Sequence, residues 1–222
     1  MRWGTLAIRA DENVAVPALE VRKPRRRGLR PAVQGLIAFA IYLDVFVLAF
    51  CLALVGHASV PVVGQVEVDP NFYIWAWDWW AYAVSHWINP LYTFQLNAPV
   101  GYNLAWATTS PAAALLMWPF TALFGPVVSF NLSLILAPVG SAWAAFVLTR
   151  RMTGRFWAAL PAGAVYGFNV YLLDHEISGQ PNLTVTLLIP LMAYLMVRWW
   201  DKSLGTAGYV IWMMIALAAE FY

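Results

Sequence analysis

No Lys or Arg occurs between Pro31 and Thr149, a stretch of more than half of the 222-residue chain. Eight of the thirteen basic residues precede Pro31, and the other five lie within 150–155 and 198–202. In membrane proteins, Lys and Arg concentrate in cytoplasmic segments, whereas Trp and Tyr collect at the membrane interfaces. A long cation-free stretch with carboxylates and many Trp residues therefore predicts the non-cytoplasmic half of an integral membrane protein.

The composition leads to the same class of protein. The chain is 62% hydrophobic and 11% charged, against about 45–50% and about 25% in soluble domains. A basic cluster that adjoins a long apolar segment is typical of a topology anchor, so we expect no nucleic-acid partner. Cys51 is the only cysteine, which excludes a disulfide within the chain and a metal site built from cysteines.

The apolar segments predict an all-α fold, a polytopic bundle of transmembrane helices that follows a basic cytoplasmic tail over residues 1–31. The transmembrane domain covers residues 32–222, with expected spans at 32–56, 127–148, 156–173, 183–197 and 206–222. Because no loop closes the last segment, we expect the chain to be truncated at its C-terminus.

Residues 104–124 allow two topologies. The segment is long enough to cross the membrane, but a crossing here would place Arg150, Arg151 and Arg155 outside. Pro111 and Pro119 also weaken a continuous span. We therefore predict a re-entrant or half-membrane element packed against protein, with a full span as the alternative.

The predicted first outer loop, residues 57–103, contains a segment with helical spacing. Polar residues recur at Asp78, Tyr82 and Ser85, while Trp75 and Trp79 line another face. This pattern predicts an aromatic-rich amphipathic helix over 71–87 that lies in the interface plane.

Carboxylates and histidines in the outward segments are the candidate functional groups. The chain lacks the HExxH, GxSxG, Walker A and GxGxxG motifs, so zinc peptidase, hydrolase and nucleotide-binding functions have no support. We predict Asp69 as a catalytic base for an acceptor hydroxyl. Alternatively, Asp69 caps a helix that starts at Pro70. The predicted substrate-binding residues are Asp78, His86, Asp174, His175 and Glu176.

Each of these substrate-binding residues also has a structural interpretation. Asp78 fits a stripe that faces water, and His86 fits a structural hydrogen-bond partner. Asp174, His175 and Glu176 fall in an expected outer loop, 174–180, where they are either solvated or hold a divalent cation together with Asp69. In the first span, Asp44 should face protein or water, either along a substrate path or as a partner of a neighbouring helix.

Several short motifs add a resemblance to a known family. These are Val68-Asp69-Pro70, Asn89-Pro90, Ala98-Pro99-Val100-Gly101, Ser110-Pro111 and Leu123-Phe124-Gly125-Pro126, with Trp75, Trp77, His86, Pro119 and Asn131-Leu132 between or after them. Over roughly residues 35–200 the chain resembles the N-terminal part of the GT-C membrane glycosyltransferases, including a group of multi-spanning bacterial proteins with this architecture.

The resemblance implies an outward active site, a polyprenyl-phosphate-linked sugar donor and a catalytic acid in the first outer loop, at Asp69. This chain departs from the pattern because its first outer loop has no Lys or Arg to bind the donor phosphate. The missing cation would then come from a C-terminal continuation or from a divalent ion.

The leading functional hypothesis is transfer of a hexosyl or pentosyl group on the outer face of the cytoplasmic membrane, in a multi-pass protein with its N-terminus inside. Its expected partners are a lipid-linked sugar donor and membrane lipids. The alternative is a non-catalytic transporter or flippase for lipid-linked glycans. A transporter would need Asp44 and other polar groups along a path through the membrane, whereas a transferase needs its carboxylates at the outer surface.

Overall fold

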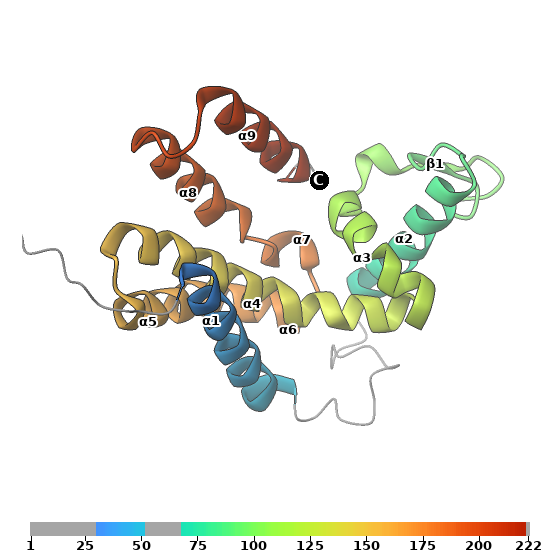
Figure 1. Ribbon diagram of the computed structural model, residues 1–222. Coiled ribbons are helices and arrows are strands. Elements are labelled where there is room, and N and C mark those ends of the chain that lie inside the picture. Colours follow the sequence, from blue (N-terminus) through green and yellow to red (C-terminus); the bar gives the residue numbers. More distant parts are fainter. Residues whose placement is uncertain (1–29, 52–67, 221–222) are drawn as a thin grey trace, which may run out of the picture.

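The computed structural model describes residues 30–51 and 68–220 and confirms the predicted all-α fold (Figure 1). The helices are α1 (Pro31–Phe46, continuing as a π-helix over Val47–Cys51), α2 (Val68–Ser85), α3 (Pro111–Phe124), α4 (Pro126–Thr153), α5 (Phe156–Gly167), α6 (Val170–Ile177), α7 (Pro181–Thr184), α8 (Leu188–Trp200) and α9 (Thr206–Glu220). Between α2 and α3, β1 (Tyr92–Thr93) pairs antiparallel with β2 (Tyr102–Asn103), and a 3₁₀ turn follows at Leu104–Trp106.

Three helical segments are long and apolar enough to cross a membrane: Pro31–Ala49, Pro126–Thr153 and Pro181–Trp200. The pair α5 and α6, bent by 45°, is a further candidate for one broken span. The chain is therefore a membrane protein. Helix α3 has 14 residues, about 21 Å at 1.5 Å per residue, which is shorter than the hydrocarbon core of about 30 Å.

Helix α4 is the central element and contacts α1, α2, α3, α5 and α8. The face of α1 that carries Gly35, Ala38, Tyr42 and Phe46 is buried. Two hydrogen bonds join α1 to its neighbours. Trp143 Nε1 on α4 donates to the Gly35 carbonyl (3.1 Å), and the Tyr42 hydroxyl donates to the Leu160 carbonyl on α5 (2.6 Å).

The basic residues of the described part gather at one end of the bundle, here called the basic end. They are Arg30 before α1, Arg150, Arg151 and Arg155 around the α4–α5 connection, and Arg198 and Lys202 around the α8–α9 connection. Arg150 Nε donates to Gln34 Oε1 (2.7 Å), and Arg151 pairs with Asp201. In Figure 1 both connections lie on the left, while β1 lies on the right.

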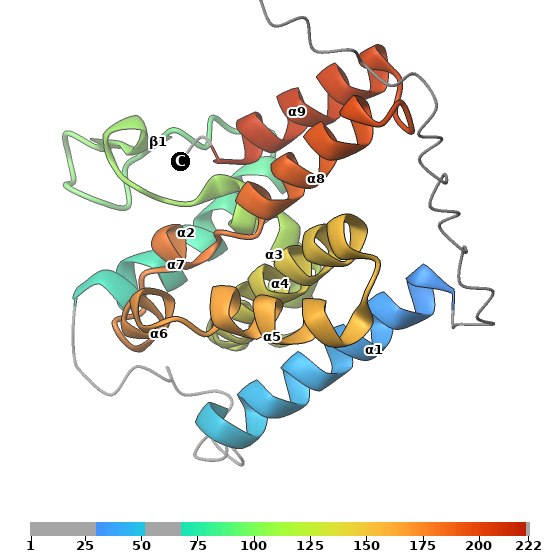
Figure 2. The ribbon, with the colours of Figure 1, turned by 90° about the vertical axis from the view of Figure 1, so that its left-hand side faces the viewer.

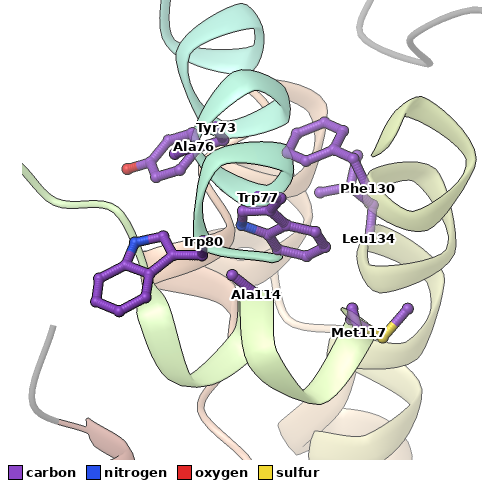
Figure 3. Close-up of a cluster of buried hydrophobic side chains, with 8 residues drawn as sticks. All are labelled: Tyr73, Ala76, Trp77, Trp80, Ala114, Met117, Phe130 and Leu134. Atoms are coloured by element: carbon purple, nitrogen blue, oxygen red, sulfur yellow. The ribbon is translucent and has the colours of Figure 1, made fainter. Parts of the chain in front are cut away.

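At the other end, α2 packs its aromatic face on α3 and on the first turns of α4. Figure 3 shows this cluster, made of Tyr73, Ala76, Trp77, Trp80, Ala114, Met117, Phe130 and Leu134. Trp77 is fully buried, with its ring edge-to-face on Phe130. These indoles of α2 are thus covered by protein, while Asp78, Tyr82 and Ser85 form an exposed stripe.

Candidate functional site

The candidate site lies at the end of the bundle opposite the basic end, where α2 and α3 meet α7. The hydroxyl of Tyr73 on α2 donates to Oδ1 of Asn182 on α7 at 2.6 Å. Pro181 occupies the first position of this single-turn helix. Proline suits this position because the backbone N–H that it lacks would have no partner within the helix. The hydrogen bond therefore fixes the first half of α2 against the segment that leads into α8.

A cavity of about 330 Å³ lies beside this hydrogen bond, between α3, α4, the α7–α8 segment and the end of α9. Its lining is mostly apolar, from Ala113, Leu116, Leu136, Val185, Leu188 and Ala219 among others. Three polar residues also line it: Ser110, Ser133 and Asn182. Apolar walls with a few polar groups are typical of sites that bind small molecules or the chain of a lipid.

Ser110 is the most unusual residue of the cavity. Its φ of 48° puts the backbone in the left-handed region, which non-glycine residues seldom adopt. Its Oγ is buried, and within the described part of the structure it has no hydrogen-bond partner. Strained backbone and an unsatisfied buried hydroxyl both favour a functional role, since neither stabilises the fold.

Glu176 is the buried carboxylate of this end. Neither of its oxygens has a hydrogen-bond partner among the described residues. Its polar neighbour Thr184 is itself buried and donates to the Pro181 carbonyl at 3.2 Å. An ionised carboxylate in such surroundings is costly unless a ligand, cation or proton satisfies it. Of the predicted substrate-binding residues, Glu176 is thus the buried one, and it does not line the apolar cavity.

Asp69 lies in the first turn of α2, because the helix begins at Val68 rather than at Pro70. Its side chain lies outside the described residues, so its catalytic role stays a prediction. Position 69 is four residues before Tyr73, and residues four apart share one face of a helix. The backbone therefore places Asp69 one turn from the junction between α2 and α7.

The structure does not bring Asp78 and His86 to this junction. Asp78 is exposed on α2. His86 follows the other end of the helix, 13 residues and about 20 Å along the axis from Tyr73. His86 Nδ1 lies 2.9 Å from the Tyr82 carbonyl, and its ring packs on the Tyr82 ring. These contacts fit the structural interpretation of His86.

The predicted outer loop over 174–180 is corrected, because α6 continues to Ile177. The helix starts where Asn169 Oδ1 accepts from the Leu172 amide. Consecutive helical residues point about 100° apart, so the three polar residues differ: Asp174 is exposed, Glu176 is buried, and His175 Nδ1 lies 2.8 Å from Gln180 Oε1. Within the described ranges, no three His, Cys, Asp or Glu side chains are grouped to hold a metal ion.

Asp44 does not face a neighbouring helix of the described part. It lies on the exposed face of α1, one turn after Ala40 and one turn before Leu48, which are exposed too. The opposite face, with Tyr42, packs on α4 and α5. The carboxylate therefore does not line a path inside the described bundle.

Sequence reasoning did not identify Tyr73, Ser110 and Asn182 as site residues. Two signals were present: polar residues within apolar segments, and a proline directly after Ser110 and before Asn182. Neither signal shows which residues meet, because Tyr73 and Asn182 are 109 positions apart.

The chain was compared with family models, curated proteins and solved structures, and none of them matches it significantly. The class of protein therefore rests on the fold and the site alone: an all-α membrane protein with an apolar cavity beside a cluster of polar groups.

Proposed function

We propose that this protein is a glycosyltransferase that takes its sugar from a polyprenyl-phosphate-linked donor. The observation that carries the proposal is the Tyr73–Asn182 hydrogen bond, which joins the wall of the apolar cavity to the helix whose first turn contains Asp69. A polyprenyl-linked donor combines an apolar chain with a polar head. The cavity suits the chain, and the junction of α2 with α7 suits the head.

In the proposed reaction, Asp69 removes the proton of an acceptor hydroxyl. The acceptor oxygen forms a bond to the anomeric carbon of the donor sugar. The bond from that carbon to the phosphate oxygen breaks, and polyprenyl phosphate leaves with the electron pair. Asp69 is the only group in this proposal that moves a proton.

The donor phosphate needs partners other than Lys and Arg, since the described basic residues lie at the basic end. Two neutral groups of the cavity can donate hydrogen bonds. They are the Ser110 hydroxyl and the amide nitrogen of Asn182, whose Oδ1 already accepts from Tyr73. A divalent cation, with Glu176 as one ligand, is the alternative way to match the phosphate charge.

The proposed location is the outer face of the cytoplasmic membrane, with the N-terminus inside. The collection of Arg150, Arg151, Arg155, Arg198 and Lys202 at one end supports this orientation, because cytoplasmic segments are rich in Lys and Arg. Transport of a lipid-linked glycan is not favoured, because Asp44 lies on the exposed face of α1.

The decisive experiment replaces Asp69 with Asn in the full-length protein. Asn keeps the size and polarity of Asp, but it cannot accept the proton. We expect transfer from a radiolabelled polyprenyl-phosphate sugar to fall roughly 10²–10⁴-fold. Asp78→Asn, on the exposed side of the same helix, is the control and should retain activity. Full activity of Asp69→Asn at normal expression would refute the assignment.

A second experiment tests the cavity without measuring activity. Ala113→Phe fills the cavity wall on α3 and should reduce labelling by a photoreactive polyprenyl phosphate several-fold. Ala122→Phe makes the same change on an exposed position of the same helix, so labelling should persist. Equal labelling of both variants would place the lipid chain elsewhere.

A further inference from the structure

The segment between α2 and α3 exposes an unusual amount of apolar surface. Residues 87–106, here called the aromatic lobe, contain β1, β2 and the 3₁₀ turn. The exposed fractions are 95% for Trp87, 86% for Trp106, 70% for Val100 and 66% for Phe94. Exposed apolar side chains in this density mark a surface that something other than water covers.

The aromatic lobe also carries no formal charge. The sequence has no Asp, Glu, Lys or Arg between Asp78 and Arg150. A partner chosen by charge, such as an acidic protein or nucleic acid, therefore finds no complement here. Uncharged Trp and Tyr are the residues that collect at the headgroup level of a bilayer.

Several backbone groups of the aromatic lobe are hydrogen-bonded to its own side chains. Asn89 Oδ1 accepts from the Leu91 amide (2.9 Å), and Asn103 Oδ1 accepts from the Ala105 amide (2.9 Å). The Tyr92 hydroxyl donates to the Val100 carbonyl at 2.6 Å. Backbone groups that are paired internally lose less free energy when they leave bulk water. An irregular segment can then enter the polar edge of a membrane.

The aromatic lobe is fixed to the helices rather than loosely attached. Trp79 Nε1 donates to the Pro90 carbonyl at 2.9 Å, and Leu104 is buried against Trp79 and Ala83. Only four residues separate Trp106 from α3, an apolar helix whose Leu116 and Leu123 are both about three-quarters exposed. The lobe is thus followed closely in the chain by a helix with exposed apolar side chains.

We propose that the aromatic lobe is a membrane-anchoring surface, with Trp87, Phe94, Val100 and Trp106 in the headgroup layer of the leaflet that α3 faces. The sequence pattern predicted this role for the aromatic residues of α2. The structure buries the indoles of Trp77, Trp79 and Trp80 in protein and exposes those of the lobe instead. Because the lobe is uncharged, its insertion should require no anionic lipid and should persist at high salt.

The test uses the full chain with Cys51→Ser, reconstituted in phosphatidylcholine vesicles, and a single cysteine that carries an environment-sensitive fluorophore. Val100→Cys places the probe on the lobe. Gly205→Cys is the control, because this position in the α8–α9 connection is exposed and has no atom within 4 Å of an added Cβ. Permeabilised vesicles give iodide access to both sides.

We expect the probe at Val100 to be quenched by lipids with a nitroxide on the headgroup, and several-fold less by iodide than the probe at Gly205. Replacing both Trp87 and Trp106 with Ser should restore quenching by iodide, whereas Trp157→Ser, an exposed Trp on α5, should not. Iodide quenching at Val100 equal to that at Gly205 would overturn the proposal. Protection from both quenchers would also overturn it, because protein would then cover the lobe. Neither readout depends on glycosyl transfer.

Discussion

Tyr73 and Asn182 form a hydrogen bond of 2.6 Å that joins α2 to α7 across 109 positions of sequence. It connects the helix whose first turn contains Asp69 to a wall of the apolar cavity. Loss of this hydrogen bond should therefore alter both the stability of the fold and the shape of the cavity.

Tyr73→Phe removes this hydrogen bond and keeps the ring. We expect the free energy of unfolding to fall by about 0.5–1.5 kcal/mol, since the Asn182 amide then loses its partner. Thermal unfolding in detergent, followed by the loss of the monodisperse peak, measures the change. Tyr82→Phe, on the exposed side of α2, should melt like the unaltered protein. Identical melting of both variants would mean that the bond contributes nothing.

Gly167→Ala should disrupt the contact between α5 and α4. An added Cβ would lie 2.4 Å from Ala142 Cβ and 2.5 Å from the Ala142 backbone nitrogen, so the helices must separate. Gly163, one turn earlier, is equally crowded, and small residues at this spacing allow close approach of helices in membranes. We expect a loss of about 1–3 kcal/mol and a lower melting temperature. Gly205→Ala is the matched control, and equal melting of the two would show that the contact is looser than described.

Trp77→Ala should be among the most destabilising single changes at the end opposite the basic end. Its side chain is fully buried against Phe130, and truncation of a buried aromatic costs about 3–5 kcal/mol. Trp77→Phe should cost clearly less, because the indole N–H has no hydrogen-bond partner within the described residues. Trp157→Ala, at 79% exposure, is expected to stay within about 0.5 kcal/mol of the parent. Urea-induced unfolding in mild detergent ranks the three variants, and the reverse order would contradict this account.

The basic end should face the cytoplasm. A single cysteine at Thr153, an exposed position beside Arg150 and Arg155, should resist a membrane-impermeant maleimide in intact cells and react after permeabilisation. Labelling of Thr153→Cys in intact cells would contradict the proposed topology. Either residues 104–124 would then cross the membrane fully, or the whole chain would have the opposite orientation.

Much of the fold could be predicted because it depends on local or additive properties. Apolar runs near 31–49 and 126–153 are helical and long enough to span, since a backbone in lipid must satisfy its own hydrogen bonds. Arg150 and Arg198 lie at the same end of the bundle, and this likewise follows from the position of each cation relative to the apolar runs. For the same reason, the exposed stripe of Asp78 and Tyr82 could be read from helical spacing alone.

The sequence by itself thus determined the class of protein, most of the helices and the end at which the cations gather. Only the tertiary structure decided which polar residues meet. Helical spacing shows which residues share a face but not what covers that face: the indole of Trp77 is buried in protein, that of Trp106 is exposed, and Glu176 is buried while its neighbour Asp174 is exposed. These differences arise from contacts between segments far apart in the chain, such as the contact between Tyr73 and Asn182. No local sequence pattern encodes the energy of such contacts.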